Sequence, residues 1–197
     1  MSGSSKGIKK IFDKFDYNSP VILTYAFICV VVYIANMVTV GRLNKLLFIT
    51  YPGSCFGLLP ALRSFLYIFG HANLQHLTGN MTLFLLVGPI VEERYGSKKL
   101  LIMIFTTAII TSVINNIIFS TGMIGASGIV FMLIMLSAFT EKSGDKIPIT
   151  LVLVFIIYIG GEIASGIFEN DNISHFGHIA GGICGLGWGF MHKKILK

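Results

Sequence analysis

Six long stretches of this chain are apolar and uncharged, and they restrict it to a small set of folds. They cover residues 20–40, 72–91, 100–119, 123–140, 147–161 and 178–191. About 20 apolar residues in a helix cross the hydrocarbon core of a bilayer, and a helix satisfies its own backbone polar groups there. Only 12% of the residues are charged, whereas a soluble domain carries about a quarter. We therefore expect an all-α, polytopic membrane protein with six transmembrane helices.

The basic side chains orient these spans, because cytosolic segments of membrane proteins are enriched in Lys and Arg. With six spans and a cytosolic N-terminus, all but three of the 15 Lys and Arg residues fall on the inner side. The outer three are Arg42, Lys45 and Arg63. A seventh span over 46–62 would place most of the basic residues outside, against this bias. We expect an irregular outer loop between the first and second spans, with both termini in the cytosol.

The chain is expected to form one membrane domain after a short lead. Residues 1–18 are polar and basic and are assigned to a cytosolic lead, and residues 19–197 to the six-span domain. The net charge of +6 comes mostly from segments between spans, which is an orientation signal. No nucleic-acid partner is expected. We predict a multi-pass protein of the cell membrane that lies in the lipid bilayer.

A serine flanked by glycines opens the fourth span, in Gly125-Ala126-Ser127-Gly128. A serine hydroxyl becomes a nucleophile when a base takes its proton, and free N–H groups at a helix start can hold developing negative charge. Glycine also lets the backbone turn sharply. Small residues of this kind equally serve as a packing motif in membrane helices. For this tetrapeptide alone, both interpretations stand.

His178 opens the sixth span and is followed by Gly181, Gly185 and Gly189. Spacing of four residues places these glycines on one helical face, where small residues allow close packing. The fourth span is the expected neighbour, so that His178 would come within reach of Ser127. The alternative is an interfacial histidine bonded to a carbonyl group.

A third set of polar residues lies at the outer end of the second span. His76 and Asn80 are four residues apart and therefore share a helical face. Both can donate hydrogen bonds to an oxyanion, although an Asn in a span also bonds between helices. His71 lies farther out and is expected either to line a polar recess or to bond the outer loop.

Together these motifs resemble the rhomboid family of intramembrane serine proteases. The resemblance covers residues 60 to 192 and implies a rhomboid-like six-helix bundle. It rests on Gly-Ala-Ser-Gly at 125–128, His-x-x-Gly-x-x-x-Gly at 178–185, the spacing of His71, His76 and Asn80, and the segment 91–96 at the end of the second span.

The resemblance implies roles for individual residues. Ser127 would be the nucleophile and His178 its general base, in a dyad without an acid. His76, Asn80 and the backbone N–H of Ser127 would form the oxyanion hole. Phe131 would stack on the histidine, at a position where the family more often has Tyr. Further supporting residues would be Gly125, Gly128, His71, Gly181 and Gly185.

The implied function is a serine endopeptidase that cleaves membrane proteins in or near their transmembrane segments. It would work in a recess open to the outer face, with no cofactor and no metal; the sequence names no substrate and specifies no oligomeric state. One alternative is a catalytically inactive rhomboid-like factor that binds membrane helices or acts in trafficking, although the chain retains Ser127 and His178. A second alternative is a transporter, but the predicted spans show no paired broken helices in two matching halves, as that class would. A third alternative is a metalloprotease that uses His71, His76, His175 and His178. The sequence has no HExxH motif, which speaks against it.

Two carboxylates lie near the ends of spans. Glu92, at the cytosolic end of the second span, is expected to cap loop amides or to pair with Arg94. Glu162 follows Gly160 and Gly161 near the outer end of the fifth span. We interpret it as an interfacial carboxylate, with the alternative that these glycines let the fifth span tilt open.

Overall fold

The protein is built from helices. The structure is a computed structural model that describes residues 16–53, 57–139, 147, 149–161, 163 and 175–195, and within these ranges it contains helices and no strand. The α-helices are α2 (Pro20–Val38), α3 (Leu58–Leu66), α4 (Leu74–Tyr95), α5 (Ser97–Ile118), α6 (Ser127–Ser137), α7 (Ile149–Val154) and α9 (His175–Ile195). Three short helices join them: η1 (Asn44–Phe48), η2 (Tyr67–Phe69) and η3 (Phe155–Ile159). The all-α prediction is confirmed.

Three helices of the described part are long and apolar enough to cross a membrane, namely α2, α4 and α5. They correspond to the first three predicted spans. The fourth predicted run contains α6 and the fifth contains α7 with η3, whereas the sixth run lies within the longer helix α9. The predictions for the lead up to residue 15 and for Glu162 lie outside the described residues.

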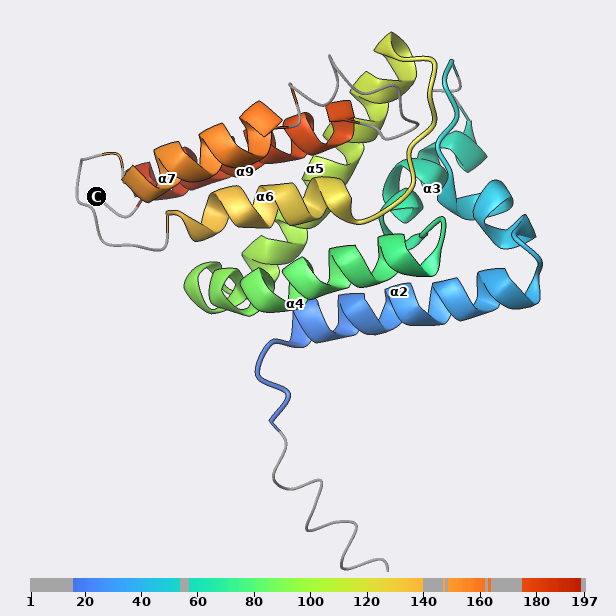
Figure 1. Ribbon diagram of the computed structural model, residues 1–197, viewed down its shortest axis with the longest axis horizontal. Coiled ribbons are helices and arrows are strands. Elements are labelled where there is room, and N and C mark those ends of the chain that lie inside the picture. Colours follow the sequence, from blue (N-terminus) through green and yellow to red (C-terminus); the bar gives the residue numbers. More distant parts are fainter. Residues whose placement is uncertain are drawn as a thin grey trace, which may run out of the picture.

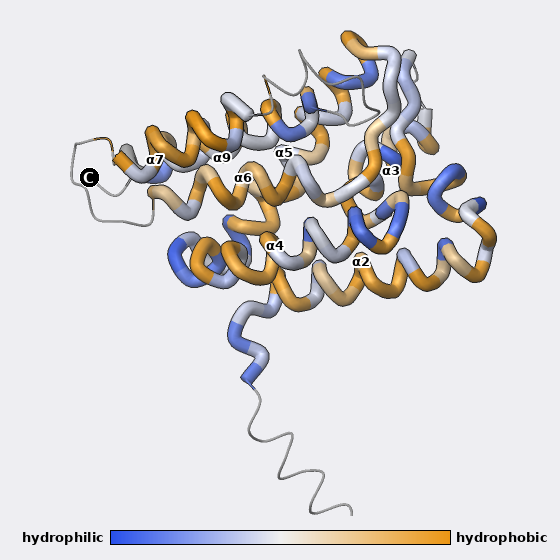
Figure 2. Tube along the Cα trace, in the orientation of Figure 1, coloured by the Kyte–Doolittle hydropathy of each residue, from blue (hydrophilic) through white to orange (hydrophobic). Residues whose placement is uncertain are grey.

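Helix α6 occupies the centre of the bundle. It lies between α4 and α9, with α2 outside α4 (Figure 1), while α7 contacts α6 and η3 contacts α9. Every side chain from Ile129 to Leu136 is buried, as expected for a helix that is apolar on all sides. By contrast, α2 exposes Phe27, Val31 and Ile34, and Figure 2 shows apolar residues along most of its length. Such a surface suits contact with lipid.

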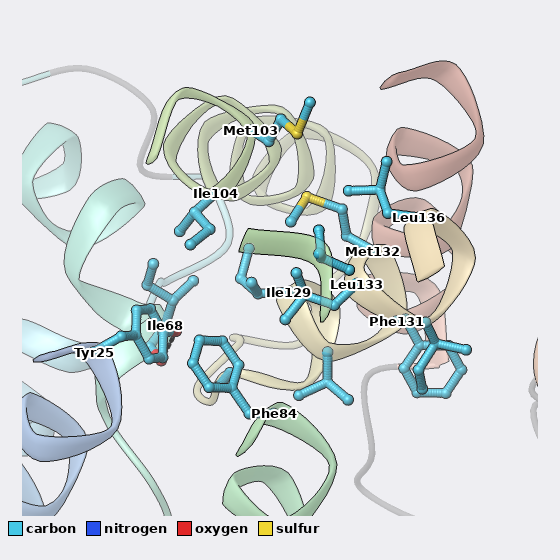
Figure 3. Close-up of a cluster of buried hydrophobic side chains, with 14 of the residues drawn as sticks. Tyr25, Ile68, Phe84, Met103, Ile104, Ile129, Phe131, Met132, Leu133 and Leu136 are labelled. Atoms are coloured by element: carbon cyan, nitrogen blue, oxygen red, sulfur yellow. Dashed lines mark hydrogen bonds between the residues drawn. The ribbon is translucent and has the colours of Figure 1, made fainter. Parts of the chain in front are cut away.

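The core joins the helices around α6. Figure 3 shows Phe84 of α4, Ile104 of α5 and Ile129 of α6 directed toward one another, close to Tyr25 and Ile68. All of these side chains are buried. The hydroxyl of Tyr25 donates a 2.8 Å hydrogen bond to the carbonyl of Ile68. The core therefore ties η2 to α2.

Glu92 joins the C-terminal end of α4 to the start of α2. Its two carboxylate oxygens accept from the backbone amides of Val21 and Ile22, each at 3.0 Å, and one of them also accepts from the hydroxyl of Ser97 at 2.7 Å. The first amides of a helix have no partner within the helix, and negative charge is favourable there. The expected capping role therefore falls on the amides of a helix and not on those of a loop.

The segment between α2 and α4 is more helical than expected from its prolines and glycines, since it contains η1, α3 and η2. The guanidinium of Arg63 in α3 donates to the carbonyls of Leu46 and Lys45 and lies 4.6 Å from the ring of Tyr51. These contacts hold α3 against η1. Leu58, Leu59 and Leu62 of α3 remain exposed.

Candidate active site

Helices α4, α6 and α9 all begin at the same end of the bundle, at the right in Figure 1.

The turn that precedes α6 packs against the side chain of His76 at the start of α4. Gly125 has a φ of +120°, a conformation that side chains disfavour. A Cβ at this position would lie 2.6 Å from the His76 ring and 3.6 Å from the amide nitrogen of Asn80. Glycine therefore permits the turn to approach His76 and Asn80.

The start of α9 packs against the start of α6 through glycines. A Cβ at Gly181 would overlap the backbone carbonyl of Gly128, and a Cβ at Gly128 would lie 3.0 Å from the carbonyl oxygen of Gly177. One turn further, a Cβ at Gly185 would lie 2.5 Å from the carbonyl oxygen of Met132. The two backbones thus touch without intervening side chains. His178 lies between two of these contact points.

The imidazole of His178 is covered on one face by Phe131. Their ring centroids are 4.7 Å apart and the planes are inclined by 5°. Tyr158 of η3 packs edge-on against Phe131 at 5.8 Å, and the ring of His175 lies 6.4 Å from that of His178. Phe131 therefore holds His178 beside the first turn of α6, which Ser127 begins.

His71 and His76 form a second ring pair, with centroids 5.2 Å apart and planes at 68°. His71 is fully buried, and its carbonyl accepts a 2.9 Å hydrogen bond from the side-chain amide of Asn44. Burial, followed by the neighbouring His76, lowers the pKa of His71 to about 4. The ring of His71 lies against His76, and its Nδ1 donates a 3.3 Å hydrogen bond to the carbonyl of Phe69 in η2. His71 is therefore linked to the segment between α2 and α4 through both its backbone and its ring.

Asn73, which is not among the residues predicted for the site, caps the helix that carries His76 and Asn80. Its side chain accepts a 2.8 Å hydrogen bond from the backbone amide of His76 and caps α4. Asn is a preferred residue at the N-cap of a helix. The position of Asn73 directly before the second apolar run is therefore a signal from which the cap could be predicted. It fixes the helical turn that carries His76.

The structure brings four predicted residues to this cluster: His76 and Asn80 from α4, Ser127 from α6 and His178 from α9. The side-chain nitrogen of Asn80 is buried and has no hydrogen-bond acceptor among the described residues, so it is available as a donor. No group of three or more His, Cys, Asp or Glu side chains in the described part of the chain is arranged to hold a metal ion.

The fold and this cluster define a helical membrane protein that gathers a serine, histidines and an asparagine where three helices begin. The chain belongs to the rhomboid family, because the family model of the rhomboid domain matches residues 60–195.

Named relatives agree with this assignment. The chain is 29% identical over 177 residues to the rhomboid protease GlpG of Salmonella typhi, which covers 87% of this chain and 63% of that relative. It is 24% identical over 181 residues to the rhomboid protease GlpG of Haemophilus influenzae, covering 90% of this chain and 93% of the relative. The chain thus spans less than two thirds of the Salmonella protein and most of the Haemophilus one.

Proposed function

We propose that this protein is an intramembrane serine endopeptidase that hydrolyses peptide bonds in or near the transmembrane segments of other membrane proteins. The observation that carries the proposal is the backbone contact of Gly128 with Gly177 and Gly181. This contact holds the start of α9 against the start of α6. In the proposal, the base His178 of α9 and the nucleophile Ser127 of α6 would therefore share one site. Membership of a family whose relatives are named proteases supports it.

In the proposed reaction, the Oγ of Ser127 attacks the carbonyl carbon of the scissile peptide bond and its proton passes to His178. The C–N bond then breaks, and the leaving amine takes the proton from His178. A water molecule gives a proton to His178 and attacks the carbonyl carbon of the acyl ester. The C–Oγ bond then breaks and Oγ takes the proton back from His178, which releases the carboxylic acid and restores both residues. The stack with Phe131 orients the imidazole throughout.

The oxyanion of the tetrahedral intermediate would be held by donors from two helices. The side chains of His76 and Asn80 approach the turn before Ser127 through Gly125, and the amide of Ser127 lies in the unpaired first turn of α6. Donors fixed in advance at the position of developing charge give a large part of the catalysis in acyl transfer.

The proposed topology has six spans in a domain of residues 19–197, with residues 1–18 and the C-terminus in the cytosol. Helix α6 has 11 residues, which at 1.5 Å per residue is about 17 Å. The hydrocarbon core is about 30 Å thick. With its far end at the cytosolic surface, α6 would begin below the outer surface, and Ser127 would lie in a recess open to the outside.

The proposal is tested by cleavage of a fluorescent transmembrane substrate in liposomes. Ser127→Ala and His178→Ala should fold as the wild type and lose cleavage, and a fluorophosphonate should label Ser127. Ser64→Ala, which alters a hydroxyl bonded within α3, is the control and should stay active. A Ser127→Ala protein that cleaves like the wild type would refute the assignment. Folded wild-type protein that binds helices without labelling would favour the inactive factor.

A further inference from the structure

The turn between α5 and α6, residues 119–126, is held by a distant part of the chain. Thr50, which is fully buried, makes two hydrogen bonds to a single residue of this turn. Its backbone amide donates to the carbonyl of Met123 at 3.0 Å, and the amide of Met123 donates to the Thr50 hydroxyl oxygen at 2.8 Å. Thr50 lies between η1 and α3. The segment that joins α2 to α4 is called the outer segment here, because the proposed topology places it on the outer side of the membrane.

Further contacts extend this attachment along the turn. The amide of Gly53 donates to the carbonyl of Asn116 at 2.9 Å, and the amide of Gly125 donates to the carbonyl of Tyr67 at 2.9 Å. A Cβ at Gly122 would overlap the carbonyl oxygen of Thr50. The outer segment therefore bonds the last turn of α5 at Asn116, the middle of the turn at Met123, and Gly125, two residues before Ser127.

This attachment matters because residues 119–126 form no helix of their own. From α5 the turn is held by the amide of Phe119, which donates to the carbonyl of Asn115 at 2.9 Å, and by the side-chain amide of Asn115, which donates to the carbonyl of Thr121 at 2.7 Å. Segments with few internal hydrogen bonds open easily unless other parts of the fold hold them. Only Ile124, Gly125 and Ala126 separate Met123 from Ser127. A shift at Met123 is therefore transmitted to the Ser127 hydroxyl and to the first amides of α6.

We propose that Thr50 is a positioning residue for the reaction: its hydroxyl holds Met123, and through the turn it sets the place of Ser127 relative to His178. The inference rests on the proposed role of Ser127 as nucleophile. It makes the outer segment part of the catalytic apparatus and not only a cover for the bundle.

The size of the effect follows from the sensitivity of acyl transfer to geometry. A misplacement of about 1 Å can cost up to about 100-fold in rate. Loss of the Thr50 hydroxyl frees one amide while the second hydrogen bond remains, so a partial effect of about 10-fold is expected. The effect should fall on the chemical step and not on ligand binding.

Thr50→Val tests this, because valine keeps the shape and the backbone amide and removes only the hydroxyl. A concentration series of a fluorophosphonate separates the half-saturating concentration from the limiting rate of Ser127 labelling. The limiting rate should fall by about 10-fold with half-saturation unchanged. Thr50→Ser keeps the acceptor and should restore the rate. Ser97→Ala, which loses a 2.7 Å hydrogen bond at the other end of the bundle, is the matched control for lost stability.

A second pair of variants keeps the test informative if Thr50→Val does not fold. Gly122→Ala inserts a methyl group against the Thr50 carbonyl and should slow labelling in the same way. Gly187→Ala adds the same methyl group where no atom lies within 4 Å and should label at the wild-type rate.

The outcomes separate this inference from the proposed function. Wild-type protein that is not labelled at Ser127 would overturn the proposed function itself. If the wild type is labelled and Thr50→Val or Gly122→Ala labels equally fast, the positioning role alone is overturned. It is also overturned if Ser97→Ala slows labelling as much as Thr50→Val at equal loss of unfolding free energy.

Discussion

The ring of Phe131 lies parallel to the imidazole of His178, 4.7 Å away between centroids and inclined by 5°. Phe131 is one turn into α6, and His178 is in the first turn of α9. The stack therefore joins the two helices that carry the proposed dyad. It leaves His178 fewer orientations than a free imidazole would have.

Phe131→Leu should lower the rate of cleavage, because leucine fills part of the space but does not stack. Aromatic pairs contribute about 0.5–1.5 kcal/mol beyond their buried area, so the turnover number should fall by about 2- to 10-fold. Phe131→Tyr should keep the rate. The measurement is steady-state cleavage of a transmembrane substrate, with Phe190→Leu, a partly exposed ring of α9, as the control. Equal rates for Phe131→Leu and wild type would remove the orienting role.

Gly181→Ala should destabilise the bundle, since the new methyl group would overlap the carbonyl of Gly128. Forcing extra volume into a packed contact costs about 1–3 kcal/mol. Gly187→Ala lies six residues further along α9 in open space, and there alanine should be neutral or slightly stabilising. Unfolding in a detergent titration measures both variants. A stability for Gly181→Ala equal to that of Gly187→Ala would contradict this helix contact.

Glu92→Gln should loosen the start of α2. The two carboxylate oxygens of Glu92 accept from Val21, Ile22 and Ser97. The side chain of glutamine has only one accepting oxygen, and its NH2 group cannot accept from the remaining donors. Hydrogen bonds to charged groups contribute about 1.5–3 kcal/mol, so the loss of unfolding free energy should be about 2 kcal/mol. Glu93→Gln changes the exposed neighbour and should have little effect. Hydrogen exchange at the first amides of α2 should increase only in Glu92→Gln.

The stability of the protein should fall in mild acid because of His71. Burial and the adjacent His76 lower the pKa of His71 from 6.5 to about 4 in the folded protein. Between these values the unfolded chain binds a proton that the folded protein does not, so unfolding becomes easier as the pH falls. The contribution is complete above about pH 6.5 and declines toward pH 4, by about 3 kcal/mol.

His71→Gln removes this titration and should flatten the pH dependence of the unfolding free energy in the same range. Both proteins retain His76 and His192, so the difference between the two curves reports His71. Curves of equal slope between pH 6.5 and pH 4 would show that His71 is not the titrating group.

Local patterns predicted much of the helical framework. The uncharged runs over 20–40, 72–91 and 100–119 correspond to α2, α4 and α5, because apolar side chains favour a helix in lipid whatever its neighbours are. Helix α4 continues to Tyr95, beyond the predicted end. The predicted run ends at residue 91 because Glu92 is the first charged residue. In the structure Glu92 is buried against α2, and its negative charge is favourable there because it faces the first amides of that helix.

The sequence by itself determined the helical class, the long apolar runs, the glycine-flanked serine and the glycine stripe on α9, since each depends on residues close together in the chain. Only the tertiary structure decided which distant segments meet. Thr50 bonds Met123 across 73 positions of sequence, and His71 faces His76 while its carbonyl bonds Asn44. Such pairs depend on how whole helices pack against one another. That packing is set by the shapes of the helix surfaces and by the need to pair buried polar groups in the assembled bundle, and neither can be predicted from a local sequence pattern.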